Sequence, residues 1–310
     1  MAESTIDRIR NLQRRKDALI LSHTYQPPEI QEIADVVGDS YGLSKEAAQA
    51  EKTGPIVFCG VRFMAETAAV LNPERSVLLP APDAGCPMAD MITAGQLRML
   101  KERHPGAPVV CYVNSSVEVK AESTVCCTSS NAVRVVESLG ETLEIIFVPD
   151  QYLGRFVERR TGRRLILWEG CCPVHERLTA ETIRELRERY PEAHVLVHPE
   201  CTPEVHDAAD ESLSTGQMIE RVRGCSGESF IIGTEGGIVY TLRRKAPGCT
   251  FHHASADLLC PDMKRITTDN LLQTLETEEP TISVPVETAR KARRAIERMI
   301  DVTERQQREP

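Results

Sequence analysis

The chain has 310 residues, of which 41% are hydrophobic and 27% charged, and its formal net charge is −9. That length is too great for one compact core and suits two or three domains. The acidic balance argues against a protein that binds nucleic acid non-specifically, because such proteins need a basic face. No apolar run approaches the roughly 20 residues of a membrane-spanning helix, and residues 1–16 lack the apolar core of a signal peptide. We therefore expect a cytoplasmic protein without membrane or nucleic-acid partners.

The apolar periodicity predicts the same succession of helices and strands three times along the chain. The first unit has helices at Thr5–Arg15 and Arg62–Leu71 and strands at Ala18–Leu21, Ile56–Gly60 and Val77–Leu79. The second has helices at Thr93–Pro105 and Gln151–Arg160 and strands at Pro108–Tyr112, Leu143–Val148 and Leu165–Trp168. The third has helices at Thr179–Pro191 and Gly236–Lys245 and strands at His194–Val197, Ser229–Gly233 and Thr250–His252. Two tail helices follow, Thr267–Leu275 and Val286–Ile300.

The repeat predicts the fold class. Strands rich in β-branched residues and separated by helices are typical of parallel sheets covered on both faces. We therefore expect an α/β protein with three similar three-layer, parallel-sheet domains, residues 1–90, 91–176 and 177–262, around a pseudo-threefold axis. The sequence leaves open whether the C-terminal helices of residues 263–310 pack on the first domain.

Cysteine usage is the most unusual feature of the composition, with eleven residues in the chain. An odd number cannot pair completely, and no two cysteines have the Cys-x-x-Cys spacing of a zinc ribbon or a bacterial ferredoxin. One Cys-Pro dipeptide follows the third strand of each unit, at Cys86-Pro87, Cys172-Pro173 and Cys260-Pro261. These are the chain's only Cys-Pro pairs, and they fall in phase with the repeat. A metal site assembled from one cysteine of each domain explains this spacing.

Two kinds of metal site are open to three such cysteines. One is a zinc ion with a vacant fourth position. The other is a [4Fe–4S] cluster that has one iron without a protein ligand and acts as a Lewis acid on a substrate oxygen. Buried thiols without any metal are the alternative for a lone cysteine. Cys171 adjoins Cys172, and we choose Cys172 because it keeps the phase of the repeat.

Polar residues follow the first strand of each unit, where parallel sheets bind ligands. They are His23 and Tyr25, Tyr112 and Asn114, and His198 and Glu200. At the same distance beyond each of these strands come Ser40, Ser129 and Thr215. Hydroxyls at the starts of helices bind carboxylates and phosphates, although simple capping of the helix is the commoner role of a single Ser or Thr. Three in register favour an anionic ligand with several charges.

Glu200 is the carboxylate among three equivalent positions, the other two being Tyr25 and Asn114. A carboxylate that faces a metal and an anionic ligand suggests a general base. His23 and His198 occupy equivalent positions, and a histidine can donate to carboxylates or move protons near neutral pH. A structural role is the alternative for each histidine and tyrosine alone.

The chain resembles the quinolinate synthase (NadA) family over nearly its whole length. The resemblance rests on motifs that occur in order and at the right spacing: Ser22-His23-Thr24-Tyr25-Gln26, Gly38-Asp39-Ser40, Phe63-Met64-Ala65-Glu66, Cys86-Pro87-Met88-Ala89, Tyr112-Val113-Asn114-Ser115, Cys172-Pro173-Val174-His175, His198-Pro199-Glu200-Cys201, Ser214-Thr215-Gly216-Gln217-Met218 and Ile232-Gly233-Thr234-Glu235. Cys171 is a departure from the family pattern.

The resemblance implies a transferase of NAD biosynthesis that condenses iminosuccinate (iminoaspartate) with dihydroxyacetone phosphate to give quinolinate, phosphate and water. It implies three α/β domains around a pseudo-threefold axis and one [4Fe–4S] cluster per chain on Cys86, Cys172 and Cys260. It carries substrate binding to His23, Ser40, Tyr112, Asn114, Ser129, His198, Glu200 and Thr215, and catalysis to Glu200, Tyr25, His23 and His198. An L-aspartate oxidase or dehydrogenase is the implied supplier of iminosuccinate.

Two other functions remain open from the residues alone. One is a lyase or hydrolase with zinc on the three cysteines, and the other is a non-catalytic protein whose symmetric pocket binds a phosphate or a dicarboxylate. Iron and sulfide analysis of anaerobically purified protein distinguishes these possibilities.

Overall fold

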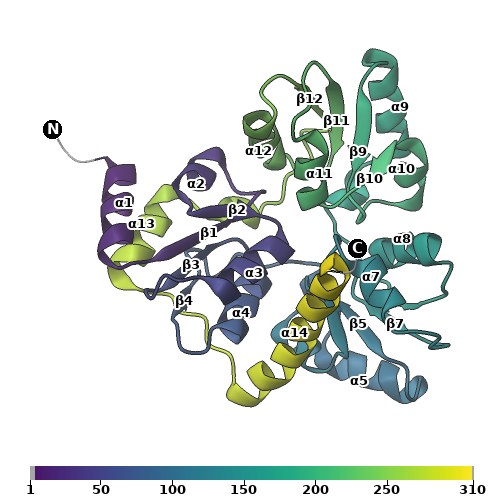
Figure 1. Ribbon diagram of the computed structural model, residues 1–310, viewed down its shortest axis with the longest axis horizontal. Coiled ribbons are helices and arrows are strands. Elements are labelled where there is room, and N and C mark those ends of the chain that lie inside the picture. Colours follow the sequence, from purple (N-terminus) through teal and green to yellow (C-terminus); the bar gives the residue numbers. More distant parts are fainter. Residues whose placement is uncertain (1–3, 309–310) are drawn as a thin grey trace.

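The computed structural model describes residues 4–308, with side chains up to residue 305. In this part of the chain, three four-stranded sheets lie around a common centre, and helices cover the faces of each sheet (Figure 1). All neighbouring strands within the sheets are parallel. The expected fold class, three similar α/β units with parallel sheets, is confirmed. Where one domain ends and the next begins stays a prediction.

The first sheet has the strand order β2-β1-β3-β4. Its elements are α1 (Thr5–Arg15), β1 (Leu19–His23), α2 (Pro28–Ile33), β2 (Val36–Gly38), α3 (Ser40–Gln49), β3 (Ile56–Cys59), α4 (Arg62–Leu71) and β4 (Val77–Leu78).

The second sheet repeats this order as β6-β5-β7-β8. Its elements are α5 (Ala94–Arg103), β5 (Val109–Tyr112), α6 (Val117–Ala121), β6 (Val125–Cys127), α7 (Ala132–Glu137), β7 (Ile146–Val148), α8 (Gln151–Thr161) and β8 (Ile166–Leu167), and the short 3₁₀ helix η1 (Ala89–Met91) precedes them.

The third sheet has the order β10-β9-β11-β12. Its elements are α9 (Ala180–Arg189), β9 (His194–Val197), α10 (Pro203–Ala208), β10 (Glu211–Ser212), α11 (Thr215–Val222), β11 (Ser229–Gly233), α12 (Ile238–Lys245) and β12 (Thr250–His253), and η2 (His175–Arg177) precedes them. The tail holds η3 (Met263–Arg265), α13 (Thr268–Thr277) and α14 (Val286–Arg308).

This strand order explains where a ligand can bind. In each unit the chain moves to one side of the first strand and then returns to the other side, so the direction of winding changes between β1 and β3, β5 and β7, and β9 and β11. The crevice at such a switch point, outside the carboxyl ends of the strands, is the usual ligand site of parallel α/β sheets. In Figure 1 the three sheets face one centre, so three switch points converge there.

Side-chain caps fix the helices that open the second and third units. Thr93 accepts from the backbone of Gln96 and Gln96 accepts in return, while Thr179 accepts from the backbone of Thr182. Each cap satisfies N–H groups that have no partner inside the helix. The starts predicted for both helices, at Thr93 and Thr179, are therefore confirmed to within one residue.

One strand in each sheet, and the short helix before it, was not predicted. These edge strands are β2, β6 and β10, and they follow α2, α6 and α10. The strands are two or three residues long, and so short a segment shows no alternation from which a strand can be recognised.

The tail joins two of the units. Helix α13 packs against α1, and the segment after it adds an antiparallel bridge from Thr281 to Leu78 at the edge of β4. Helix α14 then packs on α6 and β6 of the second unit and also on α4 of the first. Among residues 4–308, no helix combines the length and the apolar character needed to cross a membrane.

Candidate active site

Side chains from all three units line one cavity at the centre of the molecule. Every site residue expected from the sequence lies in its lining: His23, Tyr25, Ser40, Cys86, Tyr112, Asn114, Ser129, Cys172, His198, Glu200, Thr215 and Cys260. The fold therefore brings together residues that are up to 237 positions apart in the sequence.

Strand ends place the central polar residues. His23 is the last residue of β1 and Tyr112 the last of β5, while His198 directly follows β9. Parallel strands end at the same edge of their sheet, so each of these side chains lies at the ligand-binding edge of its unit. His23, Tyr112, His198 and Glu200 are all nearly inaccessible to solvent.

The three Cys-Pro loops have the same local structure. Each cysteine is followed by a proline and then by one of the 3₁₀ helices η1, η2 and η3. Two backbone amides of that turn face each sulfur, for example those of Met88 and Ala89 at Cys86. Burial nevertheless raises the pKa of the Cys86 thiol to about 12, and it also raises the pKa of Cys172 and of Cys260. All three cysteines are half-buried, and no cation beside them compensates the charge of a thiolate.

The side chains of Cys171 and Cys172 lie in different surroundings. Cys172 lines the cavity, whereas the Cys171 thiol lies beside the exposed Glu176 carboxylate. The amide of Cys171 contacts the sulfur of Met91 at 3.3 Å. Burial and this neighbouring carboxylate raise the pKa of Cys171 to about 12. The placement agrees with the choice of Cys172 from the phase of the repeat.

Glu200 is the centre of a buried hydrogen-bond network. The Tyr112 hydroxyl donates to its Oε1 at 2.6 Å, and Asn114 Nδ2 lies 3.4 Å from the same oxygen. On the other side, His175 Nδ1 is 2.7 Å from Oε2. Burial opposes the charge of this carboxylate, but His175, His198 and the Tyr112 hydroxyl more than offset it and lower the pKa of Glu200. Glu200 is therefore an anion at neutral pH.

His175 is a residue of the site to which the sequence analysis gave no role. It is buried, its Nδ1 lies 3.2 Å from Cys172 Sγ, and its Nε2 lies 2.8 Å from the Thr234 hydroxyl. The Thr234 hydroxyl is in turn 2.6 Å from that of Tyr25. A continuous chain of polar contacts thus runs from Tyr25 through Thr234 and His175 to Glu200, and it crosses the boundaries between the units.

A signal for His175 exists in the sequence. It lies three residues after Cys172, where the other two units have Ala89 after Cys86 and Met263 after Cys260. A titratable residue at a position that is otherwise apolar breaks the repeat in the way that Glu200 does.

His23 and His198 are held as neutral hydrogen-bond donors. Burial lowers the pKa of each to about 3. The Nδ1 atom of His23 accepts from the backbone N–H of Tyr25 at 3.2 Å, and that of His198 accepts from Glu200 N–H at 3.3 Å. A neutral ring whose Nδ1 accepts carries its proton on Nε2. Both rings can therefore donate from Nε2 to an anionic ligand.

The hydroxyl residues lie at helix starts without serving as the caps. Ser40 and Thr215 are the first residues of α3 and α11, and the caps are the preceding Asp39 and Ser214. Ser129 precedes α7 by three residues, and the cap position there is held by Asn131. Simple capping thus does not explain Ser40, Ser129 and Thr215, whereas contact with an anion in the cavity does.

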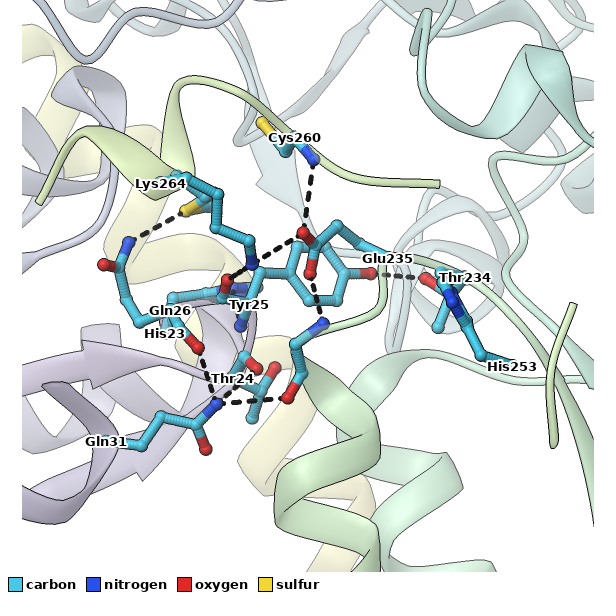
Figure 2. Close-up of polar contacts among 12 residues, drawn as sticks. His23, Thr24, Tyr25, Gln26, Gln31, Thr234, Glu235, His253, Cys260 and Lys264 are labelled. Atoms are coloured by element: carbon cyan, nitrogen blue, oxygen red, sulfur yellow. Dashed lines mark hydrogen bonds and ion pairs between the residues drawn. The ribbon is translucent and has the colours of Figure 1, made fainter. Parts of the chain in front are cut away.

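An ion pair with a buried carboxylate supports the Cys260 loop (Figure 2). Glu235 is fully buried, and its Oε1 lies 2.7 Å from Lys264 Nζ and 3.2 Å from the backbone N of Cys260. Its Oε2 accepts from Gly237 N–H at 2.7 Å. Lys264 also donates to the carbonyl oxygen of Tyr25. The sequence analysis quoted Glu235 within a family motif but gave neither charge a role.

Comparison with known proteins agrees with this geometry. The family model described as "Quinolinate synthetase A protein" (NadA) matches residues 7–301. A quinolinate synthase of Dehalococcoides mccartyi is 52% identical over 295 residues, 95% of this chain and 97% of that protein. Those of Geotalea uraniireducens and Methanoregula boonei are 49% and 50% identical and each cover 95% of this chain, which spans 96% and 97% of their own length.

The chain belongs to the quinolinate synthase family. The resemblance stated from its motifs is therefore confirmed. As a member of this family the chain is an enzyme.

The donor set also discriminates between metals. A single zinc ion on three thiolates brings the sulfurs within roughly 4 Å of one another, given Zn–S bonds of about 2.3 Å. Among the described residues, the three cysteine sulfurs do not form a group with all members within 4.8 Å. They share the cavity at a wider spacing, which suits a cluster that has its own irons and sulfides between the ligands.

Proposed function

We propose that this chain condenses iminosuccinate (iminoaspartate) with dihydroxyacetone phosphate. The products are quinolinate, phosphate and two molecules of water, so the reaction balances without an oxidant or a reductant. The observation that carries this proposal is the convergence of twelve expected site residues on one buried cavity. Identity of about 50% to quinolinate synthases over 95% of the chain supports it.

The proposed cofactor is one [4Fe–4S] cluster per chain on Cys86, Cys172 and Cys260. Three half-buried thiols that line one cavity, each faced by two backbone amides, form a donor set that fits such a cluster. When bound, the cluster supplies an open iron site that acts as a Lewis acid in dehydration. Metal binding also removes the cost of burying the thiolates, because the cation compensates their charge.

The substrates carry carboxylates and a phosphate, and the cavity offers donors for them. We assign binding of these anionic groups to the hydroxyls of Ser40, Ser129 and Thr215, the Nε2–H groups of His23 and His198, and the polar groups of Tyr112 and Asn114. Glu200 is an anion, so we assign to it the binding of a substrate N–H or O–H group, from which it accepts. Asn114 Oδ1 has no hydrogen-bond partner within the described chain although it is buried. A buried polar atom without a partner is costly, so a ligand donor, such as a substrate amino group, is expected there.

We assign proton transfer to Glu200, with Tyr25, His23 and His198. The lowered pKa of Glu200 keeps it anionic and thus ready to accept a proton. The contacts through His175 and Thr234 offer a route from Glu200 to the Tyr25 hydroxyl. Enamine formation and ring closure both require protons to leave carbon or nitrogen, and this network lies beside the cavity where they do so.

A supplier of iminosuccinate follows from the substrate. Oxidation of the amino group of L-aspartate produces this imine, so we propose an L-aspartate oxidase or dehydrogenase as the functional partner. The eleven cysteines are all free in the structure. Free thiols and an iron–sulfur cluster suit the reducing cytoplasm, which we propose as the location.

Anaerobic purification with iron and sulfide analysis tests the proposal. We expect about four irons and four sulfides per chain, as the cluster formula requires, and quinolinate formation from the two substrates. Glu200→Gln should lower the rate at least 10²-fold, the usual contribution of a general base. Glu176→Gln, an exposed carboxylate outside the cavity, is the matched control and should retain activity. A colourless active protein with stoichiometric zinc would refute the cluster, and full activity of Glu200→Gln would refute the assigned base.

A further inference from the structure

We infer that the chain without its cluster binds a single divalent metal ion at Cys172, His175 and Glu200, and that this ion and the cluster exclude one another. The competition between the two rests on the proposed function, because it needs Cys172 as a cluster ligand. The binding of the single ion does not. Zinc is the expected occupant, since thiolate, imidazole and carboxylate are its three protein ligands.

The three donor atoms already lie together. Cys172 Sγ is 3.2 Å from His175 Nδ1, which is 2.7 Å from Glu200 Oε2, and all three atoms fall within 4.8 Å of one another. Zinc bonds of about 2.0–2.3 Å at tetrahedral angles place donors roughly 3.4–3.6 Å apart. The ion therefore requires His175 and Glu200 to separate by roughly half an ångström, with no change of fold.

The ion would replace a proton. The contact between His175 Nδ1 and Glu200 Oε2 needs one hydrogen, which a metal displaces. That proton can move to His175 Nε2, where the Thr234 hydroxyl accepts it at 2.8 Å. The Cys172 thiol loses a second proton to solvent. One divalent cation with one thiolate and one carboxylate gives a neutral group, which removes the cost of an uncompensated charge in this buried place.

Neighbouring side chains hold the ligands in orientation. Thr234 fixes the outer nitrogen of His175, and the Tyr112 hydroxyl fixes Glu200 Oε1 at 2.6 Å. Such outer contacts are typical of metal-binding histidines and carboxylates. His175 is also stacked on His198, with ring centroids 4.7 Å apart. The ligand atoms are thus held before the metal arrives. All three residues line the cavity, from which water can supply a fourth ligand.

Cys86 and Cys260 take no part in this site. The group with mutual distances within 4.8 Å contains only Cys172 of the three cysteines. A bound zinc ion therefore occupies one of the three proposed cluster ligands and leaves the other two free. Zinc should in consequence slow the loading of iron and sulfide into the cluster-free protein.

The test uses cluster-free full-length protein, prepared anaerobically with reductant and titrated with Zn²⁺ or Co²⁺ alone. We expect one equivalent to bind, and the Co²⁺ form to show a thiolate-to-cobalt charge-transfer band and the visible bands of a four-coordinate ion. Cys172→Ser, His175→Ala and Glu200→Gln should each weaken Zn²⁺ binding at least 100-fold. Cys86→Ser and Cys260→Ser should bind as the parent does, and His104→Ala, on the surface, is the control for loss of a histidine.

The outcomes separate this inference from the proposed function. Loss of the tight equivalent in Cys86→Ser or Cys260→Ser would show a site on three cysteines and overturn the inference. Unchanged affinity in His175→Ala would overturn it as well. Thermal unfolding of each variant without metal identifies any that fails to fold. In that case the Zn²⁺ affinity of Glu200→Gln, whose side chain has nearly the same shape as that of the parent, decides: an affinity equal to that of the parent would overturn the inference. None of these measurements depends on quinolinate formation.

Discussion

The buried pair of Glu235 and Lys264 offers a quantitative test of how the cavity is held together. Lys264→Met removes the cation but keeps the length of the side chain. Glu235, fully buried, then retains only the backbone donors of Cys260 and Gly237. Breaking a buried ion pair costs about 3–5 kcal/mol. Because Lys264 is 28% exposed and two donors remain, we expect about 2–3 kcal/mol.

The expected loss of stability can be measured as a change in the melting temperature, Tm. Unfolding entropy of about 2.1 cal/mol/K per residue gives roughly 0.65 kcal/mol/K for this chain, so Tm should fall by about 3–5 °C. Circular dichroism of the cluster-free protein is the assay. Arg265→Met is the matched control, since it removes a neighbouring cation that is itself 47% exposed and pairs with Asp83 and Asp262. An exposed pair contributes at most about 1 kcal/mol, and the control should shift Tm by less than about 2 °C.

A double-mutant cycle with Glu235→Gln tests the reasoning directly. Removing both charges leaves no unpaired buried carboxylate, so the double variant should be more stable than the sum of the single effects predicts, by about 1–2 kcal/mol. Additive effects, or a Tm of Lys264→Met equal to that of the parent, would show that the pair stabilises nothing. With the cluster loaded, the same variants should lose iron to a chelator faster than the parent, because Glu235 holds the Cys260 backbone.

Two further predictions concern the cysteines and the histidines. Cys172→Ala should abolish bound iron and sulfide, whereas Cys171→Ala should retain them; an empty site in Cys171→Ala alone would contradict the assigned ligand. Burial lowers the pKa of His23 to about 3. Below pH 6.5 the unfolded chain therefore binds a proton that the folded chain does not. As the pH is lowered, this histidine decreases the free energy of unfolding by up to about 1.4 kcal/mol per pH unit. In urea unfolding of cluster-free protein between pH 6 and 4.5, His23→Gln should show a smaller slope than the parent, and equal slopes would refute this.

Most of the fold could be predicted because its central strands have strong local signals. β1, β5 and β9 are short apolar runs rich in Leu, Ile and Val, and capped helices adjoin them. The edge strands could not be predicted. β10 is only Glu211–Ser212, and its pairing with β9 comes from the tertiary fold. A polar pair of residues adopts this conformation because its neighbour supplies the hydrogen bonds, not because of its own propensity.

The residues of the candidate site could be predicted from the sequence, but the contacts between them could not. The repeat placed twelve residues at corresponding strand ends and loops, and all of them line the cavity. It gave no distances between units. The contact of His175 with Glu200, and that of Thr234 with Tyr25, depend on the relative orientation of the units. No spacing of residues in the sequence predicts such contacts.

The chemistry of this molecule comes from the places where its threefold repeat is broken. Equivalent cysteines in equivalent loops supply three like ligands, which suits a cluster but cannot by itself distinguish two substrates. At the position after the first strand the three units carry Tyr25, Asn114 and Glu200, and three residues after the cysteines they carry Ala89, His175 and Met263. Glu200 and His175 are the acidic and basic exceptions, and they lie 2.7 Å apart. The repeat thus assembles the cavity, and in the proposed function this one asymmetric pair sets the direction of proton transfer.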